Sequence, residues 1–107
     1  MSQTLQRVKI LVEQGDVRIS AHGYDELAAD AVSTRDVVAG VGDAIPVEDY
    51  PEYGKGPAVL VLQYDADGIP LHVLWGIPKG ESSPAVLVTA YRPDPRRWSP
   101  DFLRRRP

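Results

Sequence analysis

The residues of this sequence best suited to proton transfer lie in two apolar runs near its carboxyl end. His72 lies within P-L-H-V-L-W-G, and the later run A-V-L-V-T-A-Y-R contains Thr89, Tyr91 and Arg92. If the two runs are antiparallel strands, these side chains form a patch on one face of a sheet. Such a patch could bind a substrate and exchange protons with it. Alternatively, His72 is a half-buried histidine whose ring bonds to a neighbouring hydroxyl.

The pairing of these two strands can be predicted from the loop between them. Closing the 78–85 loop with Ile77 opposite Val86 places His72 opposite Tyr91, and a slip of one residue would move Tyr91 to the other face. If side chains alternate strictly along the later strand, three of them lie on the same face of the sheet as His72: Leu87, Thr89 and Tyr91.

The other histidine, His22, lies in R-I-S-A-H-G-Y-D-E-L-A-A-D at 18–30. Glu26 follows it by four residues, so the two side chains are neighbours on one face of a helix. A carboxylate there would orient the imidazole and raise its pKa, as a general acid or base often requires. The same spacing is also common in surface ion pairs that contribute little.

Motifs for metal or cofactor binding are missing from the sequence. It has no cysteine, and its two histidines are fifty residues apart, so neither a disulfide nor a zinc site is expected. It contains no phosphate-binding loop, no dinucleotide glycine pattern after a strand and no nucleophile elbow around serine. We therefore expect no metal and no cofactor.

The composition is that of a globular protein, with 43% hydrophobic and 25% charged residues. The net charge of −3 is unevenly distributed. Residues 1–78 hold five Lys/Arg and twelve Asp/Glu, a balance of −7, whereas residues 79–107 hold seven and three, a balance of +4. A basic end of this kind could face RNA or an acidic protein, or could simply be solvated. With no long apolar run and no signal-peptide pattern, we expect a cytoplasmic protein without a membrane association.

Hydrophobic periodicity predicts an α+β fold in a single domain, residues 1–107. The helical part, 1–42, contains two to three helices, with a short extended piece at Val17–Ile19 between the first two. The sheet part, 44–92, reads as a four-stranded antiparallel meander with the helices packed on one of its faces. The tail, 93–107, is basic and contains four prolines, so it is expected to be extended and anchored by Trp98 and Phe102.

Five short motifs in order make the chain resemble a known family, the small bacterial proteins grouped as domain of unknown function 4258. The motifs are I-S-x-H at 19–22, D-V-V-A-G-V at 36–41, D-Y-P-E-Y at 49–53, P-L-H-V at 70–73 and V-T-A-Y-R-P-D-P-R-R-W at 88–98. The resemblance covers residues 17 to 98. It implies a helix-then-sheet domain similar to metal-independent ribonuclease toxins of the barnase, colicin and RelE type.

The resemblance also implies which residues would form a site. The family's motif histidines match His22 and His72, and its closing motif matches Thr89, Tyr91, Pro93 and Trp98. The sequence departs from the family in one helix, where the usual arginines four and eight residues after the first histidine are replaced by Glu26 and Asp30. Carboxylates there would repel RNA, so the cations would have to come from elsewhere.

Two hypotheses about function remain open on the sequence alone. The first is a toxin of a toxin–antitoxin system that cleaves RNA without a metal. In it, His72 and either His22 or Tyr91 would act as acid and base, Arg92 and Lys79 would hold phosphate, and Thr89 and Trp98 would contact the substrate. The second is a non-catalytic protein-interaction domain on the same fold. RNA, a cognate antitoxin and a second copy of the chain are the partners considered.

Overall fold

The computed structural model describes residues 2–107, and its first helix is amphipathic. Helix α1 (Gln3–Glu13) begins after Ser2, whose Oγ accepts a hydrogen bond from the Leu5 backbone N–H at 3.0 Å. This contact satisfies one of the donors that a helix leaves unpaired at its start. Leu5, Val8 and Leu11 form the buried face of the helix.

Two further helices follow, each capped by a serine. Helix α2 (Ala21–Ala29) begins after Ser20 and helix α3 (Thr34–Ala39) after Ser33, and a short 3₁₀ helix, η1 (Gly40–Asp43), leads to the sheet. Ser20 accepts from the Gly23 backbone N–H at 2.9 Å and donates to the Val88 carbonyl at 2.7 Å. The cap therefore also fixes α2 against a strand 68 residues away.

The sheet has five strands rather than the four expected from the sequence. Strands β2 (Ile45–Tyr50), β3 (Ala58–Tyr64), β4 (Pro70–Gly76) and β5 (Ala85–Tyr91) form the predicted antiparallel meander. The fifth strand, β1 (Val17–Ile19), pairs parallel to β5, so the order is β1-β5-β4-β3-β2 and the sheet is mixed. The extended piece was visible in the sequence, but three residues carry no signal of a partner nearly seventy residues away.

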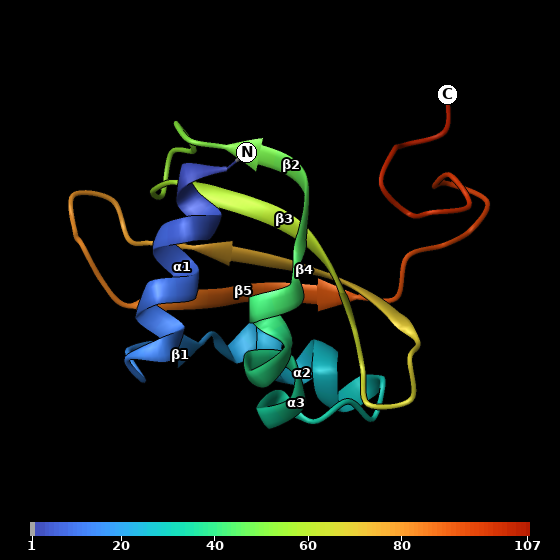
Figure 1. Cartoon of the computed structure of the whole chain (residues 1–107), viewed down its shortest axis with the longest axis horizontal. Coiled ribbons are helices and arrows are strands. Elements are labelled where there is room, and N and C mark those ends of the chain that lie inside the picture. The colour runs from blue at the N-terminus through green and yellow to red at the C-terminus, as the bar shows by residue number, and fades with distance from the viewer. Residues whose placement is uncertain (1) are drawn as a thin grey trace.

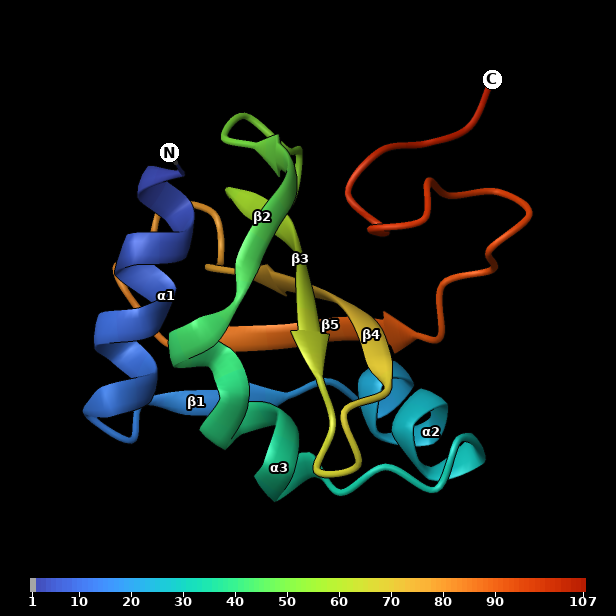
Figure 2. The same ribbon diagram turned by 45° about the vertical axis from the view of Figure 1, so that its right-hand side comes forward.

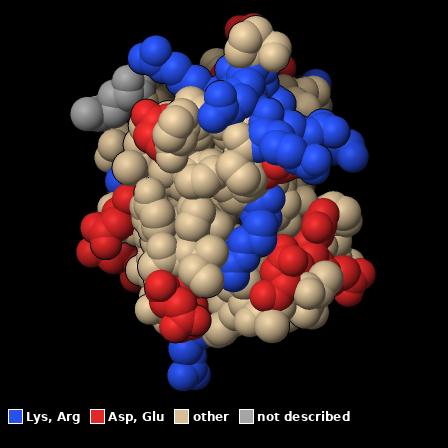
Figure 3. All heavy atoms as spheres, turned by 90° about the vertical axis from the view of Figure 1, so that its right-hand side faces the viewer, with Lys and Arg blue, Asp and Glu red and all other residues tan. Residues whose placement is uncertain are grey.

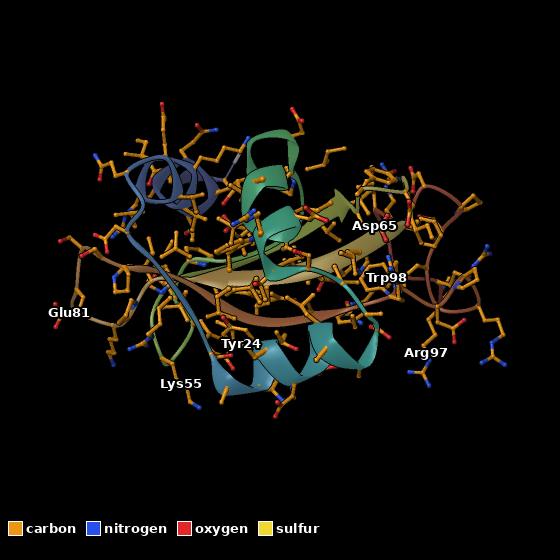
Figure 4. The ribbon with its side chains drawn as sticks, turned by 90° about the horizontal axis from the view of Figure 1, so that it is seen from below. Tyr24, Lys55, Asp65, Glu81, Arg97 and Trp98 are labelled. Carbon is orange, nitrogen blue, oxygen red and sulfur yellow. The ribbon has the colours of Figure 1, made fainter. Side chains whose placement is uncertain are left out.

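The helices do not all pack on one face of the sheet, although the sequence predicts that they do. In Figures 1 and 4, α1 and α3 lie on one side of the sheet, whereas α2 runs along the β5 edge toward the other side. Strand β1 ends at Ile19 and pairs only with the first part of β5. Helix α2 packs beside the rest of β5. The fit is close, since a Cβ on Gly23 would lie only 2.9 Å from the Leu87 side chain.

A β-bulge in β5 corrects the predicted register. His72 does lie opposite Tyr91, as expected, but Gly76 rather than Ile77 faces Val86. The extra residue, Val88, has no partner across β4, so the alternation of β5 changes phase at this point. As a result Leu87 packs with the helices in the core, whereas Thr89 and Tyr91, beyond the bulge, lie on the face of His72.

The tail folds back on itself instead of extending. The Ser99 backbone N–H donates to the Arg104 carbonyl and the Arg106 N–H to the Arg97 carbonyl, both at 2.8 Å. These bonds close a loop that curls back toward the sheet in Figure 2, with Trp98 almost fully buried beneath it. The four prolines that suggested an extended tail lie outside these paired positions or at the turn.

Within residues 2–107, no helix has both the length and the apolar character needed to cross a bilayer.

A buried glutamine links the sheet to the helical layer. Gln63 accepts a hydrogen bond from Trp75 Nε1 at 2.9 Å and donates to the Val37 carbonyl of α3 at 2.8 Å. Its amide thus satisfies a buried indole and a buried helix carbonyl, a role that no sequence pattern indicated.

We expect Gln63→Leu to lower the free energy of unfolding by about 3 kcal/mol, because two buried polar groups lose their partners. Urea denaturation measures this change. Gln6→Leu, the same substitution at an exposed position of α1, serves as the control and is expected to change stability by less than about 0.5 kcal/mol. Equal effects of the two substitutions would contradict the role assigned to Gln63.

Candidate functional site

His72, the residue predicted to lead the chemistry, is completely buried in the middle of β4. Its Nε2 lies 2.8 Å from the Phe102 carbonyl oxygen and its Nδ1 lies 3.0 Å from the Tyr91 hydroxyl. A carbonyl only accepts hydrogen bonds, so Nε2 carries the proton, and Nδ1 of the neutral ring accepts from Tyr91. Both ring nitrogens are therefore engaged within the chain.

Aromatic packing closes the remaining surface of the His72 ring. The Trp98 ring meets it edge to face, with centroids 4.4 Å apart and planes at 87°. Burial lowers the pKa of His72 below its ordinary value, although the Phe102 carbonyl acts in the opposite direction. The ring is consequently held neutral, and no substrate can reach it while the tail is in place.

An ion pair holds the tail over His72. Arg105 donates to both carboxylate oxygens of Glu48 on β2, at 2.7 and 3.0 Å, and its guanidinium lies 4.7 Å from the centre of the Trp98 ring. The Tyr50 hydroxyl donates to the same carboxylate. The hydrogen bond from Arg105 is the main reason why the pKa of Glu48 is lowered. We call this set of contacts, formed by Glu48, His72, Trp98, Phe102 and Arg105, the tail lock.

The other histidine lies on the surface. His22 is 68% exposed, and its Nε2 lies 2.8 Å from Glu26 Oε1, the i,i+4 contact expected from the sequence. The same carboxylate oxygen accepts a hydrogen bond from Thr89 Oγ1 on β5 at 3.3 Å. Thr89, expected to bind substrate, thus joins α2 to the sheet, and it connects to His22 rather than to His72.

The cationic residues predicted to hold phosphate are not gathered around either histidine. Arg92 pairs with Asp65 at 2.7 Å and also donates to the Ile69 and Pro70 carbonyls, so it anchors the β3–β4 turn. Lys79 is exposed in the β4–β5 loop. Figure 4 shows that loop, marked by Glu81, at the end of the sheet opposite Trp98.

The basic residues of the tail gather on one face. Figure 3, which views the tail side of the molecule, shows Lys and Arg crowded over its upper part and Asp and Glu toward the margins. Three of the five tail arginines already have partners within the chain: Arg96 pairs with Asp94, Arg105 pairs with Glu48, and Arg106 donates to the Pro95 and Trp98 carbonyls. Much of the predicted basic surface therefore stabilises the tail itself.

An open groove that the sequence did not reveal lies on the sheet face away from α1. It has a volume of about 240 Å³, and its floor is mainly apolar, formed by Ala58, Leu74, Gly76, Val86 and Val88. Runs such as A-V-L-V-L indicate a strand buried on both faces, so the pattern concealed that part of one face is uncovered. Among residues 2–107, no group of three His, Cys, Asp or Glu side chains is placed to hold a metal ion.

Comparison with known proteins assigns the chain to a family but not to an activity. The family described as Domain of unknown function (DUF4258) matches residues 19–92, which is more than half of the chain, and the chain therefore belongs to it. His22, His72, Thr89 and Tyr91 lie inside the matched segment, and Trp98 lies outside it. No curated protein and no solved structure matches the chain significantly.

The difference in burial between the two histidines can be tested chemically. We expect diethyl pyrocarbonate to modify one histidine rapidly in the folded protein, identified by peptide mass as His22, because His72 is sealed by the tail lock. His72 should react only after denaturation. His22→Gln is the control and should show no rapid modification. Rapid modification of both histidines in the wild type would contradict a closed tail.

Burial of neutral His72 also predicts how stability depends on pH. The unfolded chain binds a proton near the ordinary histidine pKa of 6.5, whereas folded His72 binds it only at lower pH. The unfolded state thus holds more protons below pH 6.5, so the free energy of unfolding should fall as the pH drops through this value.

Urea denaturation between about pH 8 and about pH 5 measures this effect. His72→Gln, which keeps a side chain able to donate and accept but does not titrate, should be less stable at high pH yet lose less stability on acidification. Parallel curves for the two proteins would show that His72 is not the titrating group.

Proposed function

We propose that this member of the DUF4258 family is a non-catalytic protein-binding domain whose binding surface is the open face of its sheet. The observation that carries the proposal is the apolar groove over β3, β4 and β5. A concave, mainly apolar surface with a few polar groups at its walls is typical of a binding site. Leu74 and Val88 are only partly buried there, although Val73, Trp75 and Leu87 beside them along the strands are buried.

The state of the predicted catalytic residues supports the same proposal. The His72 ring has both nitrogens bonded, Trp98 packs against it, and Arg92 holds a turn. Each of these residues therefore has a structural role that accounts for its presence. A general acid or base must instead reach the atom from which it takes a proton.

Metal-independent RNA cleavage is the second candidate, favoured by the exposed His22–Glu26–Thr89 arrangement. If His22 donates from Nε2 to Glu26, its Nδ1 is left unprotonated and faces away from the carboxylate, as a base for a ribose hydroxyl would need. The acidic surroundings oppose this role, because Asp25 on the same helix and Asp30 at its C-cap are exposed and repel phosphate. The toxin assignment rests on the family resemblance alone.

One experiment separates the two candidates. Wild-type protein, Val88→Ser and Ile10→Ser are each immobilised and exposed to a lysate of the cells that encode the chain, and total RNA is incubated with each soluble protein. Val88 lies in the groove, whereas Ile10 is 55% exposed on α1 across the sheet. We expect a specific protein to be retained by the wild type and by Ile10→Ser but lost with Val88→Ser, while the RNA stays intact.

Two results would overturn the proposal. Retention that is unchanged by Val88→Ser would remove the groove from the interaction. RNA cleavage by the wild type that is abolished in His22→Gln would instead establish the second candidate.

A further inference from the structure

The open groove has a shape that admits a side chain rather than a whole small molecule. Gly76 lies in its floor, and a Cβ there would come within 3.3 Å of the Pro57 carbonyl and 3.6 Å of Val88. Because glycine has no Cβ, the groove is deeper at Gly76 than it would be with any other residue there. The volume of about 240 Å³ is below the roughly 300–1,000 Å³ usual for pockets that enclose a drug-sized ligand.

The position of the groove also restricts how a partner can bind. Its floor comes from β3, β4 and β5, the three interior strands in the order β1-β5-β4-β3-β2. The bulge residue Val88 has no strand partner, but its carbonyl accepts a hydrogen bond from Ser20 Oγ. β3 and β4 lie between other strands, and α2 packs beside β5 where β1 ends, so a partner strand has no edge to pair with at the groove. A partner can therefore contact this surface only by packing side chains onto it.

The walls of the groove carry a charge opposite to that of the chain. Arg18 of β1 stands on one wall, and Tyr53 and Lys55 of the β2–β3 loop on another, and no Asp or Glu of residues 2–107 lines the groove. Arg18 and Lys55 are both exposed, and neither forms an ion pair with any residue described by the structure. Figure 4 shows Lys55 on the α2 side of the sheet, away from α1 and α3.

This local excess of cations is unusual for this part of the chain. Residues 1–78 contain only five Lys/Arg against twelve Asp/Glu, yet two of the five stand at the groove. Unpaired cations beside an apolar floor are complementary to a ligand that is apolar in the middle and anionic at its sides.

From these observations we propose that the groove binds an acidic peptide segment of a partner protein, with an aliphatic side chain inserted over Gly76 and carboxylates facing Arg18 and Lys55. The inference rests on the proposed protein-binding function and specifies the chemistry of the partner. The aliphatic side chain gains free energy by leaving water, and the carboxylates set orientation and increase the rate of encounter.

The test uses fluorescein-labelled synthetic peptides and fluorescence anisotropy with the full chain. The probe peptide alternates glutamate and leucine. One comparison peptide has lysine in place of glutamate, another has serine in place of leucine, and a short oligouridylate represents RNA. We expect only the glutamate–leucine peptide to bind, with an affinity that falls as salt is added because exposed charges are screened.

Charge-reversal variants localise the binding. The double variant Arg18→Glu, Lys55→Glu should weaken binding by about tenfold, since two exposed attractive contacts become repulsive. Arg35→Glu on α3 makes the same change at an exposed position across the sheet and should leave binding unchanged. Amide shifts of Gly76 and Val88 in nuclear magnetic resonance spectra should accompany peptide binding.

Each other outcome overturns the inference in a distinct way. Binding of the serine peptide as tightly as the leucine peptide would remove the aliphatic anchor. Preferential binding of oligouridylate would replace the protein partner with a nucleic acid. If no peptide binds, but the wild type retains a lysate protein that Val88→Ser does not, the partner segment is not acidic and the protein-binding function stands. If no peptide binds and Val88→Ser retains the same lysate proteins as the wild type, the proposed function fails as well.

Discussion

The constraint on which this structure depends is that its central strands are apolar on both faces. Six of the seven residues of β3 are buried, and β4 alternates between the helical core and the opposite face with few polar residues on either. A sheet of this kind must be covered on both sides to keep its side chains out of water. The helices α1 and α3 cover one side. Helix α2 packs beside β5 toward the other side, and the fifteen residues after Arg92 cover a further part of it.

The tail covers one end of that second face and leaves the other end open. Its contacts concentrate on His72, whose two ring nitrogens join β4 to β5 through Tyr91 and to the tail through Phe102. A neutral histidine suits this position, because it provides one donor and one acceptor in opposite directions within an apolar environment. The groove is what remains of the face beyond the reach of the tail lock, and its uncovered apolar floor is the basis of the proposed function.

The uneven charge of the chain has a structural explanation in the same region. Arg105 of the basic tail meets Glu48 of the acidic part, and the pair lies against Trp98 at the edge of the covered area. Opposite charge thus helps bring two distant segments together at the place where the tail must close. Arg18 and Lys55, two cations of the acidic part, stand at the groove without such a partner.

The sequence by itself determined the local structure of this protein. Hydrophobic periodicity predicted the helices and the four-stranded meander. These features depend on residues close together in the chain, where hydrogen bonding and side-chain alternation act directly. The predicted pairing of His72 with Tyr91 is observed, but the Ile77–Val86 pairing from which it was inferred is not, because the bulge at Val88 shifts the register. Tertiary structure alone decided the rest. The pairing of β1 with β5, the bulge at Val88 and the folding of the tail over His72 all depend on contacts between distant segments. Those contacts determined that His72 is buried, that His22 stays exposed, and that the groove between Arg18 and Lys55 remains open.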